Sequence, residues 1–202
     1  MARWAPQRRD VLEQLVDELL HNYGRSRAII AIDGVDPAST AAFSADVAEE
    51  LTRRGHAVFR AALSGFHRSR ADRESRGSDS AVTAYRDGFD FSVFRRILVE
   101  PFRMGEGAAF VLAAFDVERD RPIPAKWRSG PHDAILLVDG TYLGRSELRG
   151  LWNTWIRLED TAAVADDAEK LYTAEVDPRT EATIVIDVTD PEHPRRRFAD
   201  SC

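Results

Sequence analysis

The feature that most constrains this chain is a short apolar segment that leads through a glycine turn into an amphipathic helix. Residues 28–33 form an apolar run with an acid at its end and are followed by Gly34, as expected of a strand buried on both faces of a parallel sheet. Phe43, Val47 and Leu51 then recur at the spacing of one helix face. Strand, glycine turn and helix form the repeating unit of a sheet in which strands and helices alternate.

The alternation of strands and helices continues along the chain. The first 24 residues are predicted to contain an N-terminal amphipathic helix, because apolar residues recur at helical spacing between positions 11 and 20. Further helices are expected at residues 91–98, closed before Pro101, and at residues 161–172. Further strands are expected at residues 56–63, 108–115, 134–139, 155–158 and 182–187.

These elements predict an α/β fold of three layers, in which a mostly parallel central sheet is covered by helices on both faces. Residues 1–202 are expected to form a single domain, because no linker divides the chain. The charged stretch at residues 64–80 is predicted to lie outside the core. Residues 192–202 are predicted to form a flexible tail.

The composition excludes several classes of function. The formal net charge of −6 disfavours a nucleic-acid platform, which usually needs a basic face. Cys202 is the only cysteine, so neither an internal disulfide nor a cysteine metal site is expected. No apolar stretch approaches the ~20 residues that span a bilayer, and the N-terminus lacks the apolar middle of a secretory signal. We therefore predict a cytoplasmic protein without nucleic-acid or membrane partners.

The glycine turn matches a phosphate-binding motif only in part. In the motif Gly-x-x-x-x-Gly-Lys-Ser/Thr, backbone N–H groups and a lysine hold nucleotide phosphates. Gly34 matches the first glycine, but Ser39 stands at the second glycine and Thr40 at the lysine. Ala41 stands where a hydroxyl would bind the metal. The lysines of the chain lie far from this turn in the sequence, at Lys126 and Lys170.

Polar residues follow several of the predicted strands. Asp33 and Asp139 each end an apolar run and precede a glycine, and Ser64 and Asp116 follow two other strands. In a doubly wound sheet the ligand-binding crevice lies beyond the carboxyl ends of the strands. We therefore expect these four residues to share one edge of the sheet.

Several short segments occur in an order and spacing typical of one family. They are residues 32–36 (Ile-Asp-Gly-Val-Asp), 65–68 (Gly-Phe-His-Arg), 85–90 (Tyr-Arg-Asp-Gly-Phe-Asp), 138–140 with 145–149, and 186–191. In these segments the chain resembles the uridine kinase-like branch of the P-loop kinases. The resemblance implies the P-loop NTPase fold. It also implies transfer of a phosphoryl group from ATP, with Mg²⁺, to a hydroxyl of a nucleoside or similar small molecule.

The resemblance further implies which residues would form the site. Ser64 stands where the family has an acid that orients the accepting hydroxyl, and Asp139 where a strand-end acid would hold magnesium through water. The residues that bind the nucleotide would be Gly34, Asp36, Ala38, Ser39, Thr40 and Ala41. The residues that bind the acceptor would be Phe66, His67, Arg68, Tyr85, Arg86 and Asp87.

The sequence departs from what this chemistry needs. Pro37 has no N–H to offer a phosphate, Thr40 supplies no cation, and Ala41 has no hydroxyl for magnesium. Ser64 replaces the acid, and residues 161–169, where relatives carry lid arginines, are short and acidic. Losing the lysine and one loop N–H would remove roughly 3–6 kcal/mol, or about two to four orders of magnitude in binding or rate. We therefore expect weak ATP binding and impaired phosphoryl transfer.

Three functions are compatible with these residues. The first is a ligand-binding or regulatory pseudokinase. The second is an active ATP-dependent kinase of a nucleoside or sugar, in which an arginine such as Arg68, Arg86 or one from a partner replaces the lysine. The third is a structural subunit that pairs with a lysine-bearing paralogue. A homodimer is a further hypothesis.

At each candidate position a structural role competes with the functional one. The helix start after Gly34 is either a residual anion site or an ordinary helix start capped by Ser39 or Asp36. Asp139 either holds magnesium or belongs to a simple turn.

The acceptor residues carry the same ambiguity. His67 and Arg68 either contact the substrate or lie in a solvated loop. Arg86 and Asp87 either bind the acceptor as a donor–acceptor pair or cap the helix that follows.

Overall fold

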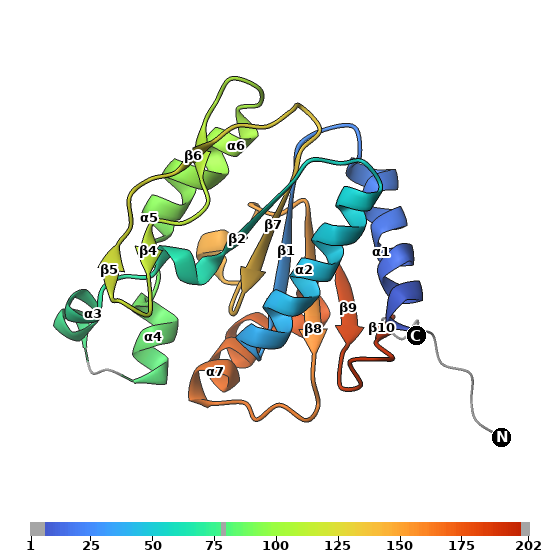
Figure 1. The fold of residues 1–202 in the computed structure, drawn as a ribbon. Coiled ribbons are helices and arrows are strands. Elements are labelled where there is room, and N and C mark those ends of the chain that lie inside the picture. The colour runs from blue at the N-terminus through green and yellow to red at the C-terminus, as the bar shows by residue number, and fades with distance from the viewer. Residues whose placement is uncertain (1–6, 78–79, 199–202) are drawn as a thin grey trace.

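The computed structural model of the chain describes residues 7–77 and 80–198 (Figure 1). Its helices are α1 (Arg8–Tyr23), α2 (Pro37–Arg53), α3 (Arg70–Arg76), α4 (Ala81–Asp87), α5 (Phe91–Phe94), α6 (Glu100–Arg103), α7 (Asp167–Val176) and α8 (Pro178–Glu181). Two 3₁₀ segments are η1 (Leu63–Phe66) and η3 (Ser146–Leu148), and η2 (Arg95–Val99) is a π-helical segment. None of the helices within these ranges is long and apolar enough to cross a membrane. Residues 1–6 and 199–202, which include Cys202, lie outside the described part.

Six strands form the central sheet. The strands of the structure are β1 (Ala28–Gly34), β2 (Val58–Ala62), β3 (Phe110–Val111), β4 (Phe115–Asp116), β5 (Arg121–Pro122), β6 (Trp127–Arg128), β7 (Ile135–Gly140), β8 (Thr154–Glu159), β9 (Ile184–Asp187) and β10 (Arg195–Arg197). The sheet order is β10-β9-β8-β1-β7-β2, and its pairs are parallel except that β10 runs antiparallel to β9. This arrangement confirms the predicted mostly parallel α/β fold.

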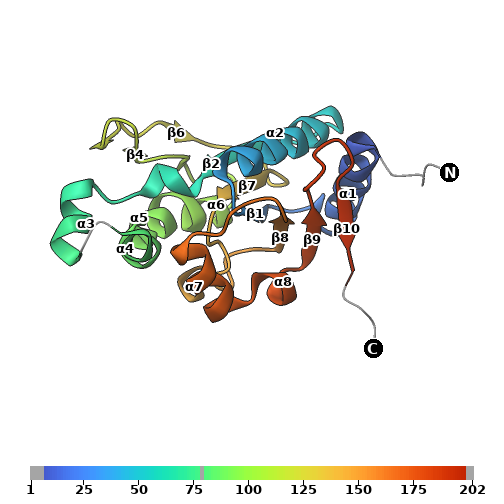
Figure 2. The same cartoon turned by 90° about the horizontal axis from the view of Figure 1, so that it is seen from below.

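Alternate residues of the central strand β1 pack against helices on opposite faces of the sheet. Ile30 and Ile32 belong to a buried cluster with residues of α1 and α2, whereas Ile29 and Ala31 belong to a second cluster with residues of α5, α6 and α7. Figure 2 shows α1 and α2 on one side of the sheet and α7 on the other. The three predicted layers are therefore present.

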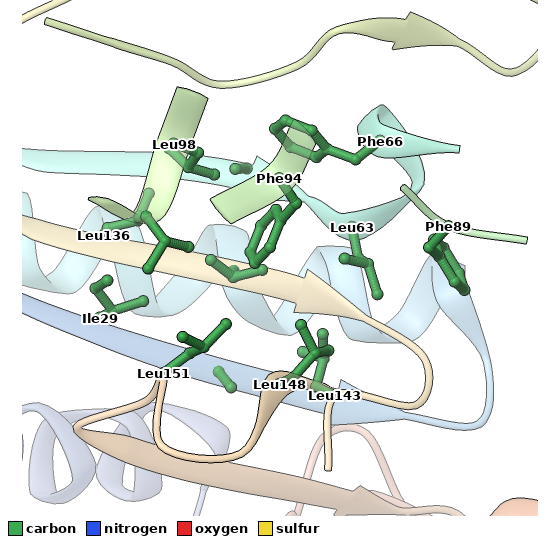
Figure 3. Close-up of a cluster of buried hydrophobic side chains, with 14 of the residues drawn as sticks. Ile29, Leu63, Phe66, Phe89, Phe94, Leu98, Leu136, Leu143, Leu148 and Leu151 are labelled. Atoms are coloured by element: carbon green, nitrogen blue, oxygen red, sulfur yellow. The ribbon is translucent and has the colours of Figure 1, made fainter. Parts of the chain in front are cut away.

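The second cluster includes part of the stretch predicted to lie outside the core. Phe66 is 1% exposed and packs edge-on against Phe94, with ring centroids 5.1 Å apart. Figure 3 shows both rings among the buried side chains of this cluster. The prediction for residues 64–80 is therefore wrong at Phe66, whereas α3 buries none of its residues.

The strand predicted at residues 108–115 is not part of the central sheet. Instead β3 pairs with β6, and β4 pairs with β5, as two short antiparallel pairs. The apolar character of the segment is explained by packing on the helices, since the Phe110 ring lies 5.3 Å from that of Phe102. Asp116 therefore does not share the main sheet edge, and its carboxylate pairs with Arg119 at 2.9 Å.

The helix predicted at residues 91–98 does not end before Pro101. α5, η2 and α6 follow one another directly as one helical segment. Proline lacks the N–H that an α-helix interior requires, and a wider π-type turn precedes it, in which the Glu100 N–H donates to the Arg95 carbonyl. The helix therefore continues past the proline and buries Phe102.

Two boundaries near the C-terminus also differ from the prediction. α7 begins six residues later than expected, because the Asp166 carboxylate caps it by accepting the Glu169 N–H at 2.8 Å. The prediction of a flexible tail at residues 192–202 is wrong at residues 195–197, which form β10. This strand pairs with β9 through its backbone, and Arg196 forms an ion pair with Glu18 of α1.

Candidate functional site

The turn between β1 and α2 carries the residues predicted to bind a nucleotide. The Asp36 carboxylate caps α2 by accepting hydrogen bonds from the Ser39 N–H at 2.8 Å and, more weakly, from the Ala38 N–H at 3.4 Å. The Thr40 N–H donates to the Asp36 carbonyl at 3.0 Å, and Pro37 has no N–H. Each N–H of the first helical turn is therefore either missing or already bonded.

Of the two alternatives for this segment, a residual anion site or an ordinary capped helix start, the geometry matches the capped helix start. The Ser39 N–H holds the pKa of Asp36 below its usual range, so the carboxylate is charged at neutral pH. A negative charge at a helix N-terminus is favoured by the helix dipole, in the same way as a bound anion. Asp36 thus supplies from within the chain the anion that this helix end attracts.

Thr40 packs directly on Gly34, the glycine retained from the motif. The Thr40 side chain is buried, and its Oγ1 donates to the Asp36 carbonyl at 2.7 Å. A Cβ on residue 34 would lie 2.2 Å from that Oγ1. The Thr40 side chain therefore points back into the turn, and the turn closes on a glycine because no side chain fits there.

Arg60 is a cation beside this turn that the sequence analysis missed. From β2 it donates through Nη2 to the Ala41 carbonyl at 2.8 Å and through Nε to the Ser44 hydroxyl at 3.1 Å. Its Nη2 also lies 3.4 Å from Oδ1 of Asp139. A single charged residue inside an otherwise apolar strand is the signal that could have identified it.

Asp139 lies at the carboxyl end of β7, at the predicted sheet edge. It is 5% exposed, and the register of the parallel strands places it beside Ile32 of β1. Burial raises the pKa of Asp139, while the Ser44 hydroxyl and the Arg60 guanidinium oppose that shift. Its carboxylate is therefore already engaged by neighbours of the chain.

Four polar side chains form a buried cluster behind the turn: Asp33, Arg157, Glu169 and Tyr172. Arg157 donates to Asp33 at 3.1 Å and pairs with Glu169, and Tyr172 donates to Asp33 at 2.6 Å. Burial raises the pKa of Asp33, and Arg157 and Tyr172 oppose the shift by stabilising the carboxylate. The cluster joins β1, β8 and α7. Glu169, at the end of the acidic stretch 161–169, is thus paired with a buried arginine.

The first group of predicted acceptor residues, Phe66, His67 and Arg68, lies just beyond β2. The His67 ring packs at a tilt against Phe89 with centroids 4.4 Å apart, and its Nδ1 is buried without a partner among residues 7–77 and 80–198. Burial, aided by the nearby Arg73, lowers the pKa of His67 to about 4. The imidazole is therefore neutral at pH 7.

The second group lies on α4. The Tyr85 hydroxyl donates to Glu175 at 2.8 Å, and Arg86 pairs with the same carboxylate at 3.0 Å. The buried Arg145 guanidinium lies 4.5 Å from the centroid of the Tyr85 ring. Tyr85, Arg86 and Arg145 line a cavity of about 190 Å³. Asp87 is the last residue of α4 and is partly exposed.

Arg68 and Arg86, the arginines considered as substitutes for the missing lysine, pair with acids outside the turn. Arg68 pairs with Asp72 at 3.5 Å and with Asp90 at 3.3 Å, and Arg86 is held by Glu175. Ser64 is exposed in η1. The structure thus brings the turn together with Asp139 and Arg60, and it divides the acceptor residues into two groups with different partners.

Solved structures share this architecture. A possible uridine kinase from Bacillus stearothermophilus is similar with a TM-score of 0.73 and 18% identity, over 88% of this chain and 97% of that chain. The chain has the fold of the uridine kinase-like P-loop kinases. The fold implied by the sequence motifs is therefore confirmed.

Two further structures share the fold. A candidate fructose transport system kinase from Silicibacter sp. TM1040 is similar with a TM-score of 0.61 and 24% identity, over 81% of this chain and 80% of that chain. D-glycerate 3-kinase from Cryptococcus neoformans var. grubii has a TM-score of 0.50 and 10% identity, over 86% and 80%. No protein-family model and no curated protein matches the chain. Similarity at these identities establishes the fold and leaves activity to be argued from the site.

The donors around the turn do not fit the magnesium ion that this kinase fold implies. Mg²⁺ needs oxygen ligands in near-octahedral geometry, commonly a carboxylate, a hydroxyl and substrate phosphates. Ala41 has no hydroxyl, and the Asp139 carboxylate is engaged by Arg60 and Ser44. Within the described ranges, no group of three or more His, Cys, Asp or Glu residues is placed to hold a metal ion.

Proposed function

We propose that the chain is a uridine kinase-like protein with impaired phosphoryl transfer, which binds a small molecule as a ligand-binding or regulatory pseudokinase. The observation that carries this proposal is the Asp36 carboxylate, which occupies the N–H groups of Ser39 and Ala38. A triphosphate that approaches this helix meets a fixed negative charge in place of free donors. Thr40, in the position of the lysine, supplies no compensating cation.

The size of these effects supports a large loss of phosphate binding. A hydrogen bond to a charged group contributes about 1.5–3 kcal/mol. The two occupied N–H groups together therefore correspond to roughly 3–6 kcal/mol, or about two to four orders of magnitude in affinity. Absence of the lysine adds to this loss.

The acceptor side supports retained binding of a small molecule. Tyr85, Arg86 and Arg145 line a cavity of about 190 Å³. The two guanidinium groups donate hydrogen bonds, and Glu175, which also lines this cavity, accepts them. We expect a hydroxyl-bearing ligand, such as a nucleoside or a sugar, to bind there.

Titration calorimetry with ATP and Mg²⁺, together with a coupled ADP-release assay over a panel of nucleosides and sugars, tests the proposal. We expect no sub-millimolar, Mg²⁺-dependent affinity and no ADP release above background. Asp36→Asn keeps a helix cap without its charge and should raise the affinity for ATP several-fold. Asp46→Asn, which removes an acid paired with Arg8 further along α2, is the matched control. A wild-type turnover rate of about 1–100 s⁻¹, the usual range for kinases, would contradict the proposal.

Arg60 favours a second candidate function, an active ATP-dependent kinase of a nucleoside or sugar. Its guanidinium lies beside the turn, within 2.8 Å of the Ala41 carbonyl, whereas Arg68 and Arg86 are held by acids elsewhere. An arginine can hold a phosphate as a bidentate donor. ADP release that is abolished by Arg60→Ala and retained by Arg86→Ala would establish this alternative.

We further propose that the protein acts in the cytoplasm on a small molecule. Nucleic acid is not the expected partner, since the net charge of −6 would repel a phosphate backbone. Formation of a homodimer and pairing with a lysine-bearing paralogue stay predictions. Analytical ultracentrifugation of the purified chain tests the first, and copurification from the source cells tests the second.

A further inference from the structure

The Arg60 side chain extends from β2 toward Asp139, the acid near the end of β7, and toward the first turns of α2. In the register of the sheet, Arg60 pairs with Leu137 and Ala62 pairs with Asp139. Side chains two residues apart along a strand share a face, so Arg60 and Asp139 project from the same face of the sheet. Leu137, on that face of β7, packs in the cluster formed with α1 and α2.

The Arg60 guanidinium binds three groups at this place. It donates to the Ala41 carbonyl at 2.8 Å and to the Ser44 hydroxyl at 3.1 Å, and it lies 3.4 Å from the Asp139 carboxylate. The Arg60 side chain is 37% exposed, whereas that of Asp139 is 7% exposed. Arg60 therefore covers the acid from the solvent side and joins it to the helix.

In P-loop NTPases a divalent cation is shared by a hydroxyl at the start of the helix and a strand-end acid. Ala41 stands at the position of that hydroxyl, and its carbonyl is bound by a guanidinium. The acid Asp139 is bound by the same guanidinium. One permanently charged side chain thus connects the residue that lacks the metal-binding hydroxyl with the strand-end acid.

We propose that Arg60 is a built-in cation that takes the place of the divalent metal, so that the site binds its ligands without Mg²⁺. The guanidinium supplies positive charge next to Asp139 and leaves this carboxylate unavailable as a metal ligand. Its Nη1 makes no hydrogen bond among residues 7–77 and 80–198, and it is a donor available to an anionic group of a ligand. Arg60 holds Asp139 in this way whether or not phosphoryl transfer survives.

Manganese binding tests this inference without any nucleotide, because Mn²⁺ is a spectroscopic probe for magnesium sites. Electron paramagnetic resonance of free Mn²⁺ should reveal no Asp139-dependent site in the wild-type protein at millimolar Mn²⁺. Arg60→Ala combined with Ala41→Ser, which frees Asp139 and restores a hydroxyl beside it, should gain one site with a Kd of about 1 mM or below, the range of weak oxygen-ligand sites. Ala41→Ser alone should gain none, because Arg60 still holds Asp139. Adding Asp139→Asn to these two changes should remove that site again.

Arg54→Ala is the matched control, because Arg54 pairs with Asp17 and Glu50 at the far end of α2. It should leave Mn²⁺ binding unchanged. Arg60→Met keeps the apolar stem of the side chain, and it replaces Arg60→Ala if thermal unfolding shows that the latter is not folded. Mn²⁺ binding by the wild-type protein that Asp139→Asn removes would overturn the inference. A folded variant with Arg60→Ala and Ala41→Ser that gains no Mn²⁺ site would overturn it as well.

Discussion

Arg157 and Asp33 are 124 positions apart in the sequence and form a buried ion pair 3.1 Å long. They are partners in the parallel register of β8 and β1, and both side chains are at most 6% exposed. Glu169 of α7 binds the same guanidinium, and Tyr172 donates to Asp33. The pair therefore links the central strand to the helix that follows β8, directly behind the candidate turn.

Arg157→Met should destabilise the protein by about 3–5 kcal/mol, because it leaves two buried carboxylates without a cation. Tyr172→Phe removes one hydrogen bond to Asp33 and should cost about 1.5–3 kcal/mol. Urea denaturation followed by circular dichroism measures both. Equal stability of Arg157→Met and the wild type would show that the pair is not a structural requirement.

Gly34→Ala should destabilise the turn by about 1–3 kcal/mol, because the new Cβ would lie 2.2 Å from the Thr40 Oγ1. Thr40→Ala removes that oxygen, so the double variant should be more stable than the sum of the two single changes predicts. Thermal unfolding of the four proteins gives this coupling. If the stability changes of the two single variants simply add in the double variant, the contact between residue 34 and the Thr40 side chain is contradicted.

Asp36→Ala should lower stability by about 1 kcal/mol, because the N–H groups of Ser39 and Ala38 lose their acceptor. Asp36→Asn should retain most of the stability, because asparagine is an equally good helix cap. Chemical denaturation at pH 7 measures both changes. The same loss in both variants would mean that charge, and not the cap geometry, stabilises this helix end.

His67 should make stability depend on pH between pH 7 and pH 5. Its folded pKa of about 4 lies below the ordinary value of 6.5, so the unfolded chain binds a proton more readily and stability falls as the pH falls through this window. The total effect, which is reached only below about pH 4, has an upper bound of about 3.5 kcal/mol, at about 1.4 kcal/mol per pKa unit.

His67→Gln should therefore lose less stability than the wild type on acidification from pH 7 to pH 5. Urea denaturation at several pH values gives the comparison. His132→Gln is the matched control, since His132 lies on the surface with a side chain that is 73% exposed. Parallel pH profiles of the wild type and His67→Gln would contradict a buried, neutral imidazole.

The elements that could be predicted are those whose signal is local. The mostly apolar runs at residues 28–33, 134–139 and 155–158 coincide with β1, β7 and β8, and the helical spacing before Gly24 coincides with α1. A strand buried on both faces is mostly apolar, so each run identifies its own element without knowledge of its neighbours.

The elements that were predicted incorrectly depend on distant partners. The apolar segment 108–115 buries its side chains against helices instead of joining the central sheet. The helix before Pro101 continues because a wider π-type turn precedes the proline, which has no N–H to donate. β10 forms because its backbone pairs with β9. None of these partners is visible within the segment itself.

The sequence by itself determined the positions of β1, β7 and β8, the missing lysine at Thr40 and the acids Asp33 and Asp139 near the ends of two central strands, because residue type and local spacing specify them. Only the tertiary structure decided that Asp36 caps α2 and that Arg60 holds Asp139. It also decided that Arg157 lies between two buried acids. A charge pair depends on strand register and helix placement, and these bring together side chains that the sequence separates by many residues.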